Sequence, residues 1–311
     1  MKTSAIARII IWSIVAVLLT GILCTALAGG NLFGLKFDFP FWGSGMNYAD
    51  ANLYTAGNGS VPASGIKQIE VNWTAGSVAI EPYDGQSVQF EEKNSSTLKE
   101  EEKLHYVVHD DKLIIQYRKS RAFWGFGFQA HGGKELTVKV PWSLSGNLKE
   151  LEVSAVSANT LVWELSAEEI SLETVSGRID AHALTCKELN LETVSGQITA
   201  ETCTAASADV TSVSGDILLG GTFETVDTEN VSGKTEISSG HCPSSVGASS
   251  VSGTIKLQIP ENEGFTARYE TVGGKFTSGF ASTAEKGRCV YKNGNADFDF
   301  ETVSGNIEVT K

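Results

Sequence analysis

The side chains of this chain that could do chemistry are carboxylates that recur at a nearly constant spacing in its second half. Glycosidases cleave sugar chains with two carboxylates at a defined separation, so one pair from this series could form a carbohydrate-active site. A carboxylate repeated in every unit is also typical of a solvated face, and no pair here differs from the others. We favour the non-catalytic interpretation and keep the enzyme as the alternative. The residues are Glu173, Glu192, Glu229, Glu270 and Glu301, with Asp180, Asp216 and Asp227 nearby.

The histidines and acids do not indicate metal or cofactor chemistry. His105 and His109 lie in a strand-like pattern, which would place their rings about 13 Å apart. The acids lack the Gly-Gly-x-Gly-x-Asp repeat that binds calcium, and no Gly-x-Ser-x-Gly motif follows a strand. We therefore predict no catalytic, cofactor-binding or metal-binding residue.

The cysteines show no Cys-x-x-Cys spacing, so a zinc site is not expected. Cys186 and Cys203 are close to one repeat apart and could face each other on neighbouring coils. A disulfide there is one interpretation, in an oxidising compartment. The interpretation that we favour is that these cysteines, with Cys242 and Cys289, are small buried hydrophobic residues.

A repeat of about nineteen residues organises the second half of the chain. The sequence Leu-Glu-Thr-Val-Ser-Gly occurs at 172–177 and again at 191–196, and degraded copies follow. The last position of each copy, an alanine in the first and a glycine in the others, falls at 158, 177, 196, 215, 233, 253, 274 and 305. A sustained period of this length predicts an all-β, single-stranded β-solenoid (a β-helix-like fold) with ~19-residue coils.

Alignment on the glycine predicts which positions build the core. Valine stands two places before the glycine in every copy from Val175 to Val303, and isoleucine usually stands two places after it. We expect these two ladders to form the core, and the Thr/Ser/Asn ladder three places before the glycine to hydrogen-bond along the stack. Glycine itself is expected at a corner where the next coil approaches closely. The wider gap before Gly305 predicts an inserted hairpin at 288–295.

The N-terminal residues indicate attachment to a membrane. Lys2 and Arg8 precede nineteen uncharged residues, 9–27, which are long enough to cross a bilayer. The positive charge predicts a cytoplasmic N-terminus with the remainder outside. Residues 1–28 are thus a transmembrane anchor or, alternatively, a signal segment cleaved after Ala28. Residues 29–64 form a Gly/aromatic linker, 65–150 irregular β-solenoid turns and 151–311 the regular repeat.

Two further features bear on partners. A glycine-rich stretch presents Phe123, Trp124, Phe126 and Phe128, which we predict to be a partner-binding loop because aromatic side chains dominate contact energies. The first 150 residues carry 14 Lys+Arg and 14 Asp+Glu, whereas residues 151–311 carry 10 and 23. The net charge of -13 therefore lies in the repeat, which argues against a nucleic-acid partner.

The order of motifs resembles the bacterial putative-adhesin domain family of unknown function, which includes LiaG-like and YvlB-like envelope proteins. The resemblance covers 66–311 and is carried by Ile69-Glu70-Val71, by 75–80, by 136–141 and by the Thr-Val-Ser-Gly series. It implies a β-solenoid on a short N-terminal membrane segment, and no catalytic residues.

These observations predict a non-enzymatic, membrane-anchored, extracytoplasmic β-solenoid that binds a cell-envelope or surface component. If the segment at the N-terminus is cleaved, the protein is secreted. The alternatives are the carbohydrate-active β-helix enzyme and an envelope-stress accessory or structural spacer.

Overall fold

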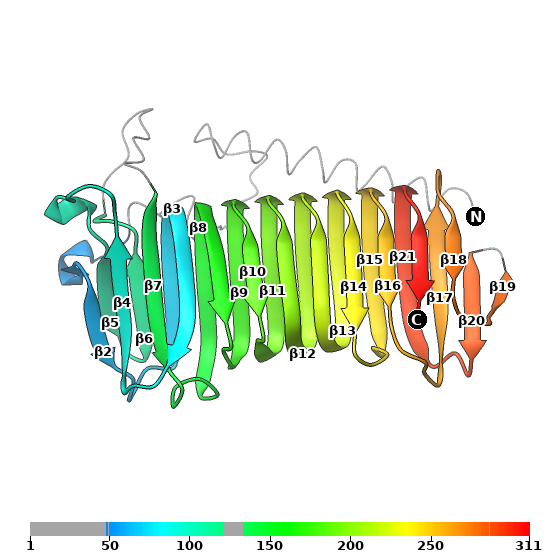
Figure 1. The fold of residues 1–311 in the computed structure, drawn as a ribbon, viewed down its shortest axis with the longest axis horizontal. Coiled ribbons are helices and arrows are strands. Elements are labelled where there is room, and N and C mark those ends of the chain that lie inside the picture. The colour runs from blue at the N-terminus through cyan, green and yellow to red at the C-terminus, as the bar shows by residue number, and fades with distance from the viewer. Residues whose placement is uncertain (1–47, 49, 121–132, 286) are drawn as a thin grey trace.

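The chain folds into an elongated all-β stack, seen in a computed structural model that describes residues 48, 50–120, 133–285 and 287–311 (Figure 1). The all-β solenoid predicted from the repeat is confirmed. Within the described residues the only helical elements are two 3₁₀ turns, η1 (Ala51–Leu53) and η2 (Glu100–Glu102). No described helix is long and apolar enough to cross a membrane. The predicted transmembrane segment, 9–27, lies outside the described residues.

Parallel strands in register form the central coils. Leu172 pairs with Leu191, which pairs with Val210, so that equivalent positions of successive repeats lie side by side. Each coil combines a long segment such as Thr185–Ser195 with a short one such as Ile179–His182. The strands are β8 (Leu148–Trp163), β9 (Ala167–Ser176), β10 (Ile179–His182), β11 (Thr185–Ser195), β12 (Ile198–Ser214), β13 (Ile217–Ser232), β14 (Thr235–Ser239), β15 (Ser245–Ser252) and β16 (Ile255–Gln258).

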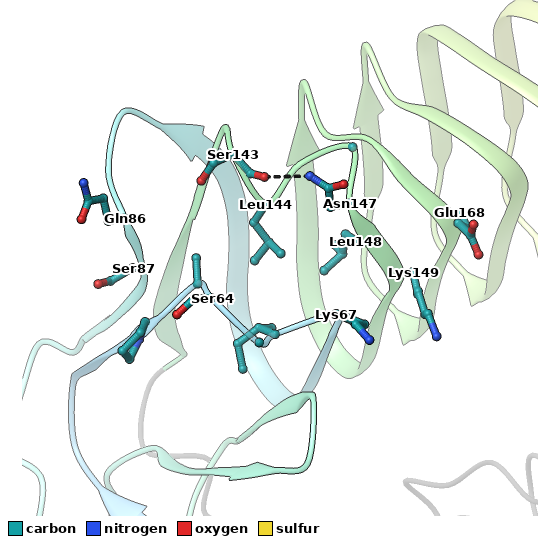
Figure 2. A pocket seen from close by; sticks show the side chains of 15 residues that line it. Ser64, Lys67, Gln86, Ser87, Ser143, Leu144, Asn147, Leu148, Lys149 and Glu168 are labelled. Atoms are coloured by element: carbon teal, nitrogen blue, oxygen red, sulfur yellow. Dashed lines mark hydrogen bonds between the residues drawn. The ribbon is translucent and has the colours of Figure 1, made fainter.

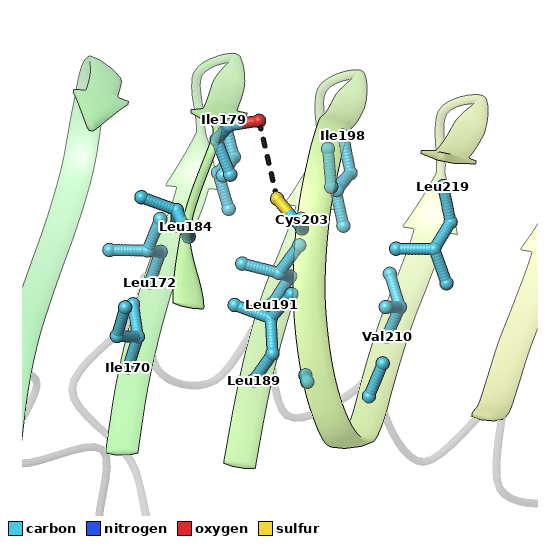
Figure 3. Packing of buried hydrophobic residues seen from close by; sticks show 14 of the residues in the cluster. Ile170, Leu172, Ile179, Leu184, Leu189, Leu191, Ile198, Cys203, Val210 and Leu219 are labelled. Atoms are coloured by element: carbon cyan, nitrogen blue, oxygen red, sulfur yellow. Dashed lines mark hydrogen bonds between the residues drawn. The ribbon is translucent and has the colours of Figure 1, made fainter. Parts of the chain in front are cut away.

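The core lies between the long and short segments of each coil (Figure 3). Leu189 and Leu191 point inward from the long segment of one coil, and Ile198 from the short segment of the next. Each is fully buried, and like residues stack on like residues from coil to coil. Since no coil covers its own apolar face, the free energy of folding depends on contacts with neighbouring coils.

The prediction that the valine ladder builds the core is wrong. Val175 and its counterparts are partly exposed on the outer face, and Val272 is 71% exposed. The Thr/Ser/Asn ladder, which includes Thr174 and Thr193, is buried instead. Side chains alternate across a strand, so Leu172 and Thr174 point inward while Glu173 and Val175 point outward. The alternation breaks just before Ser-Gly, because Val175 and Ser176 both face outward.

Some members of the Thr/Ser/Asn ladder donate hydrogen bonds at the glycine corners. Asn230 Nδ2 donates to Gly215 O at 3.0 Å, and Thr271 Oγ1 donates to Gly305 O at 3.4 Å. A Cβ added to Gly196 would lie 1.8 Å from Gly177 O. Glycine is therefore required at these corners because the carbonyl group of the adjacent coil occupies the space of a side chain.

The opposite corner uses residues in the left-handed region. Glu164, Ala183 and Thr202 have φ of 48°, 53° and 58° and stand one repeat apart. The next step of the repeat is one residue shorter, and the register between β12 and β13 shifts between Ala200 and Cys203. The coil that contains β13 is therefore one residue shorter at this corner, and its glycine corner is unchanged.

At the N-terminal end the first long strand lies inside the stack. β3 pairs in parallel with β8 on one side and with β6 and β7 on the other. Antiparallel hairpins cover the outer edge, and β1 and β2, which fall within the predicted linker, pair with β5 and β4. The strands are β1 (Thr55–Ala56), β2 (Gly59–Pro62), β3 (Gln68–Tyr83), β4 (Ser87–Lys93), β5 (His105–His109), β6 (Lys112–Gln116) and β7 (Lys134–Pro141).

At the C-terminal end, too, the order of the strands in space differs from their order in the sequence. β21 lies between β15 and β17, and β22 lies between β16 and β18, so the last coil in the sequence is the second from the end in space. The predicted hairpin at 288–295 contributes one strand, β20, which pairs antiparallel with β17 and β19. The strands are β17 (Gly264–Thr271), β18 (Phe276–Ser278), β19 (Thr283–Glu285), β20 (Arg288–Lys292), β21 (Ala296–Ser304) and β22 (Ile307–Thr310).

Candidate functional site

The predicted carboxylates form one row on the outer face of the long segments. The register places Glu173 beside Glu192 and Glu301 beside Glu270, with neighbouring strands about 4.8 Å apart. The row is not purely acidic, because Thr211 and Ser249 interrupt it on either side of Glu229. The structure thus brings the five glutamates into line but leaves only two adjacent pairs.

A second row runs parallel to the first, two residues earlier in each strand. Asp209 and Asp227 are adjacent in it, Gly247 follows, and Asp299 pairs with Arg268 at its end. Of the three aspartates predicted to lie nearby, only Asp227 belongs to this face. Asp180 lies on β10, where Arg178 Nε is 3.4 Å from Asp180 Oδ1. Asp216 lies at a glycine corner and accepts from Lys234 N at 2.8 Å.

Burial and mutual repulsion keep several of these carboxyl groups protonated to unusually high pH. Partial burial raises the pKa of Glu173 from 4.5 to about 7, with smaller contributions from Glu192 and Glu152. Burial also raises the pKa of Glu152, and Glu70 adds to that shift. Glu229 has a raised pKa for the same reason, with Asp227 as its neighbouring charge. Glu173 therefore titrates near neutral pH, and other carboxyl groups on this face have pKa values raised in the same direction.

A hollow of about 410 Å³ opens on this face where Gly247 supplies no side chain. Carboxylates of Asp209, Asp227, Asp297 and Asp299 line it, and Arg268 donates to both oxygens of Asp297 at 2.6 and 2.5 Å. No group of three or more His, Cys, Asp or Glu among the described residues is arranged to hold a metal ion.

The histidines and cysteines that the structure describes are held by local contacts or are free thiols. His109 Nδ1 lies 3.3 Å from Asp110 Oδ2, and His105 Nδ1 lies 3.0 Å from Lys103 O. Cys203 does not face Cys186: Thr204 pairs with Thr185, and Cys186 pairs with Ala205. Both thiols are free, and burial raises the pKa of Cys186 to about 12, which opposes formation of a thiolate.

The aromatic loop predicted from Phe123, Trp124, Phe126 and Phe128 lies outside the described residues, but its two flanks are described. Tyr117 precedes it and Lys134 follows it. Lys134 is 1% exposed, its Nζ lies 2.7 Å from Glu92 Oε2, and it donates to Glu102 O at 2.8 Å and to Tyr117 O. The same ammonium lies over the rings of Tyr117 and Trp73, at 4.0 and 5.0 Å from their centroids.

This buried lysine was not anticipated from the sequence. A signal was present, since Lys134, Leu136 and Val138 alternate inward along β7. Burial lowers the pKa of Lys134, and the hydrogen bond and charge of Glu92 oppose that shift. The ammonium therefore fixes both flanks of the aromatic loop to the end of the solenoid.

A larger hollow, of about 910 Å³, lies at the N-terminal end between three loops (Figure 2). The loops are 62–67, 86–87 and 143–149, and they join β2 to β3, β3 to β4 and β7 to β8. Each loop alone shows only turn residues in the sequence. Their convergence depends on the inserted position of β3, which the sequence did not indicate.

Comparison with known proteins identifies the family. The family model described as Toastrack DUF4097 matches residues 66–310, and the chain belongs to this family. The resemblance to the putative-adhesin domain family of bacterial envelope proteins is thereby confirmed. A search of curated proteins finds no match.

Several solved structures are similar over most of the chain. One is described as a putative adhesin from Bacteroides fragilis, with 14% identity, a TM-score of 0.47 and coverage of 81% of this chain and 95% of that one. Another, from Parabacteroides distasonis and also described as a putative adhesin, has 16% identity, a TM-score of 0.45 and coverage of 82% and 97%.

Proposed function

We propose that this protein is a non-enzymatic, membrane-anchored, extracytoplasmic binding module of the bacterial cell envelope. The observation that carries the proposal is the shape of the described structure. A rigid stack of coils with both ends covered by hairpins presents long, solvent-facing polar rows instead of enclosing a reacting atom. Such a solenoid offers an extended surface for a partner. Residues 1–28 would hold it to the membrane, with the N-terminus in the cytoplasm.

The aromatic loop supplies the strongest contacts in this proposal. Buried Lys134 fixes the described flanks of this loop, and aromatic side chains dominate contact energies at binding surfaces. We expect the purified full-length chain to bind isolated cell-wall material saturably. The double variant Trp124→Ala/Phe126→Ala should bind at least tenfold more weakly, whereas Trp142→Ala, which removes a 52% exposed tryptophan elsewhere, should bind normally.

Unchanged binding by the double variant would remove this loop as the contact, and no binding by the wild-type chain would remove the function itself.

Membrane attachment is tested separately. Fractionated cells should contain the full-length chain in the membrane fraction, and a soluble product shortened by residues 1–28 would indicate the cleaved signal instead.

One observation favours the enzyme as the second candidate. Glu173 has a pKa raised to about 7 and stands beside Glu192, so the pair could contain an acid and a base at neutral pH. Retaining glycosidases use carboxyl groups about 5 Å apart. The enzyme predicts release of reducing ends from an envelope polysaccharide by the wild-type chain and not by Glu173→Gln. No release by either protein would exclude it.

A further inference from the structure

The hollow at the N-terminal end has walls that are fixed before any ligand binds. Ala63 N donates to Gln86 O at 3.0 Å, which ties the first loop to the second. In the third loop, Asn147 Nδ2 donates to Ser143 O at 3.0 Å (Figure 2), and Gly146 N donates to Ser166 O at 3.0 Å. Preorganised loops reduce the entropy lost on binding, so a shallow site can still hold a ligand.

The lining combines an apolar floor with a polar rim. Ile66, Leu144 and Leu148 form the floor and are 6%, 4% and 1% exposed. Hydroxyl and amide groups surround it, with Ser64, Gln86 and Ser87 on one side and Ser143 and Asn147 along another (Figure 2). These groups both donate and accept hydrogen bonds. A sugar ring matches this arrangement, because it has apolar C–H faces and a hydroxyl edge.

Two lysines give one side of the hollow a positive charge. Lys67 and Lys149 lie together on the side away from Ser64 and Gln86 (Figure 2). Lys67 Nζ is 3.8 Å from Asp111 Oδ2, whereas Lys149 is exposed and its charge adds to that of Lys187 in lowering the pKa of Glu168. The one carboxylate in the lining, Glu168, is paired with Lys187 at 2.9 Å. Lys149 is thus available to a negatively charged ligand, although the repeat half of the protein is strongly acidic.

We propose that this hollow binds an acidic sugar residue of an envelope glycan, with the ring on the Ile66–Leu144 floor and its anionic group at Lys149. The proposal rests on the envelope-binding function above and names the ligand chemistry of a second site within it. The hollow lies between loops at the end of the stack, and its described lining contains no residue of the two carboxylate rows.

Titration of the purified full-length chain with oligogalacturonate and with a neutral oligogalactose of equal length tests this proposal. The wild-type chain should bind the acidic oligosaccharide, less tightly as salt is added, and bind the neutral one at least tenfold more weakly. Lys149→Gln should weaken binding of the acidic oligosaccharide about tenfold. Ser64→Trp, which fills the hollow from an exposed position, should abolish binding. Lys139→Gln, an exposed lysine outside the hollow, should bind as the wild type does.

Equal affinity for the acidic and neutral oligosaccharides, or normal binding by both Lys149→Gln and Ser64→Trp, would overturn the proposal. Circular dichroism should show that every variant keeps the β fold, since Ser64 and Lys149 are exposed. If these variants bind cell-wall material as the wild type does while Trp124→Ala/Phe126→Ala does not, the hollow is rejected and the envelope-binding function stands.

Discussion

The two corners of a central coil differ in what they demand of a residue. One corner has no room for a Cβ, whereas the other holds a non-glycine residue in the left-handed region. Gly196→Ala would place its Cβ 1.8 Å from Gly177 O, so we expect it to lower the free energy of unfolding by about 3 kcal/mol or more. Ala183→Gly should raise it by about 0.5 kcal/mol, because Ala183 has φ of 53° and glycine adopts this region without strain. Urea denaturation measures both changes.

The control for the second substitution is Ala181→Gly, which removes a buried methyl group from β10 and should destabilise the protein. Stabilisation by Ala181→Gly as well, or destabilisation by Ala183→Gly, would contradict the assignment of strain to this corner.

The raised pKa of Glu173 predicts a pH-dependent effect. Because its pKa is about 7 in the folded protein and 4.5 in the free residue, the native state holds this proton more tightly than the unfolded state. The native state is therefore not penalised below about pH 4.5, loses stability as the pH rises toward 7, and carries the full cost above it. Glu173→Gln should be about 1 kcal/mol more stable than the wild type at pH 8, after allowance for solvent screening, and equal to it at pH 4.

Denaturation at both pH values checks this expectation. Glu188→Gln, which neutralises an exposed glutamate on β11, should show little difference at either pH. An equal stabilisation of Glu173→Gln at pH 4 and pH 8 would mean that ionisation is not the cause.

Residue types predicted which positions matter but not which side of the strand they occupy. The glycine corner was predictable, since only glycine recurs there. Valine and threonine are both good strand formers, however, and valine recurs in every copy whereas the position before it varies among Thr, Ser and Asn. The sequence therefore suggested a valine core, whereas the structure buries Thr174 and exposes part of Val175. Two inward polar side chains donate a hydrogen bond to a neighbouring glycine carbonyl, Asn230 to Gly215 and Thr271 to Gly305, whereas Thr193 and Ser212 are buried without a hydrogen-bond partner in the described structure.

Among the elements, β7 depends on the ion pair of Lys134 with Glu92. Lys134→Met should destabilise the protein by about 3 kcal/mol, because it leaves a buried carboxylate and two backbone carbonyls without their partner. The second change Glu92→Gln should recover part of this loss, since it removes the uncompensated charge. The control Lys139→Met removes an exposed lysine of the same strand and should change stability little.

Thermal denaturation measures these differences, and hydrogen exchange at 117 and 134 should report local opening in Lys134→Met. A double variant less stable than Lys134→Met would show that the buried charge is not the source of the loss.

Strands and turns were largely predictable from the sequence, but which of them lie together in space was not. The hairpin of β5 and β6 around Asp110 follows directly from alternation and turn chemistry. The hollow whose floor includes Ile66 depends on loops 62–67 and 143–149, which are far apart in the sequence. Local sequence patterns do not indicate which distant loops meet in space. A site formed by three loops could therefore not be located from the sequence.

At the scale of the whole molecule, the central coils are interchangeable and the ends are not. Deletion of residues 178–196 removes one complete coil and brings Ile198 into the place of Ile179, so the register and the core are kept. We expect this variant to fold cooperatively with a urea m-value reduced in proportion to its length. Truncation after Asn295 removes β21 and β22, which separates β15 and β16 from β17 and β18 and leaves two unpaired edges.

Size-exclusion chromatography and circular dichroism distinguish the two variants. The shortened solenoid should be monodisperse and the truncated one aggregated. A folded, soluble truncated variant would contradict the inserted position of the last coil.

The order of the coils is the part of the fold that the repeat could not predict. Every copy of the motif can stack on every other, because each offers the same valine, glycine and polar positions. Copies ending at Gly253, Gly274 and Gly305 thus suggest a stack in that order. The close approach of Gly305 to Gly253 O, at 1.9 Å from an added Cβ, shows that Gly305 follows Gly253 instead. Antiparallel pairing of β17 with β20 favours this arrangement, since it gives β17 a partner on its outer edge.

The insertion of β21 between β15 and β17 determines the order in which the strands can pair during synthesis. Strands β17 to β20 leave the ribosome before residues 296–310, yet they cannot take their final places until those residues arrive. Until then the edge of β15 is unpaired, and stacking of β17 directly on it would occupy the place of β21. A growing chain that has not yet reached residue 296 therefore carries an unpaired strand edge that can pair with other chains.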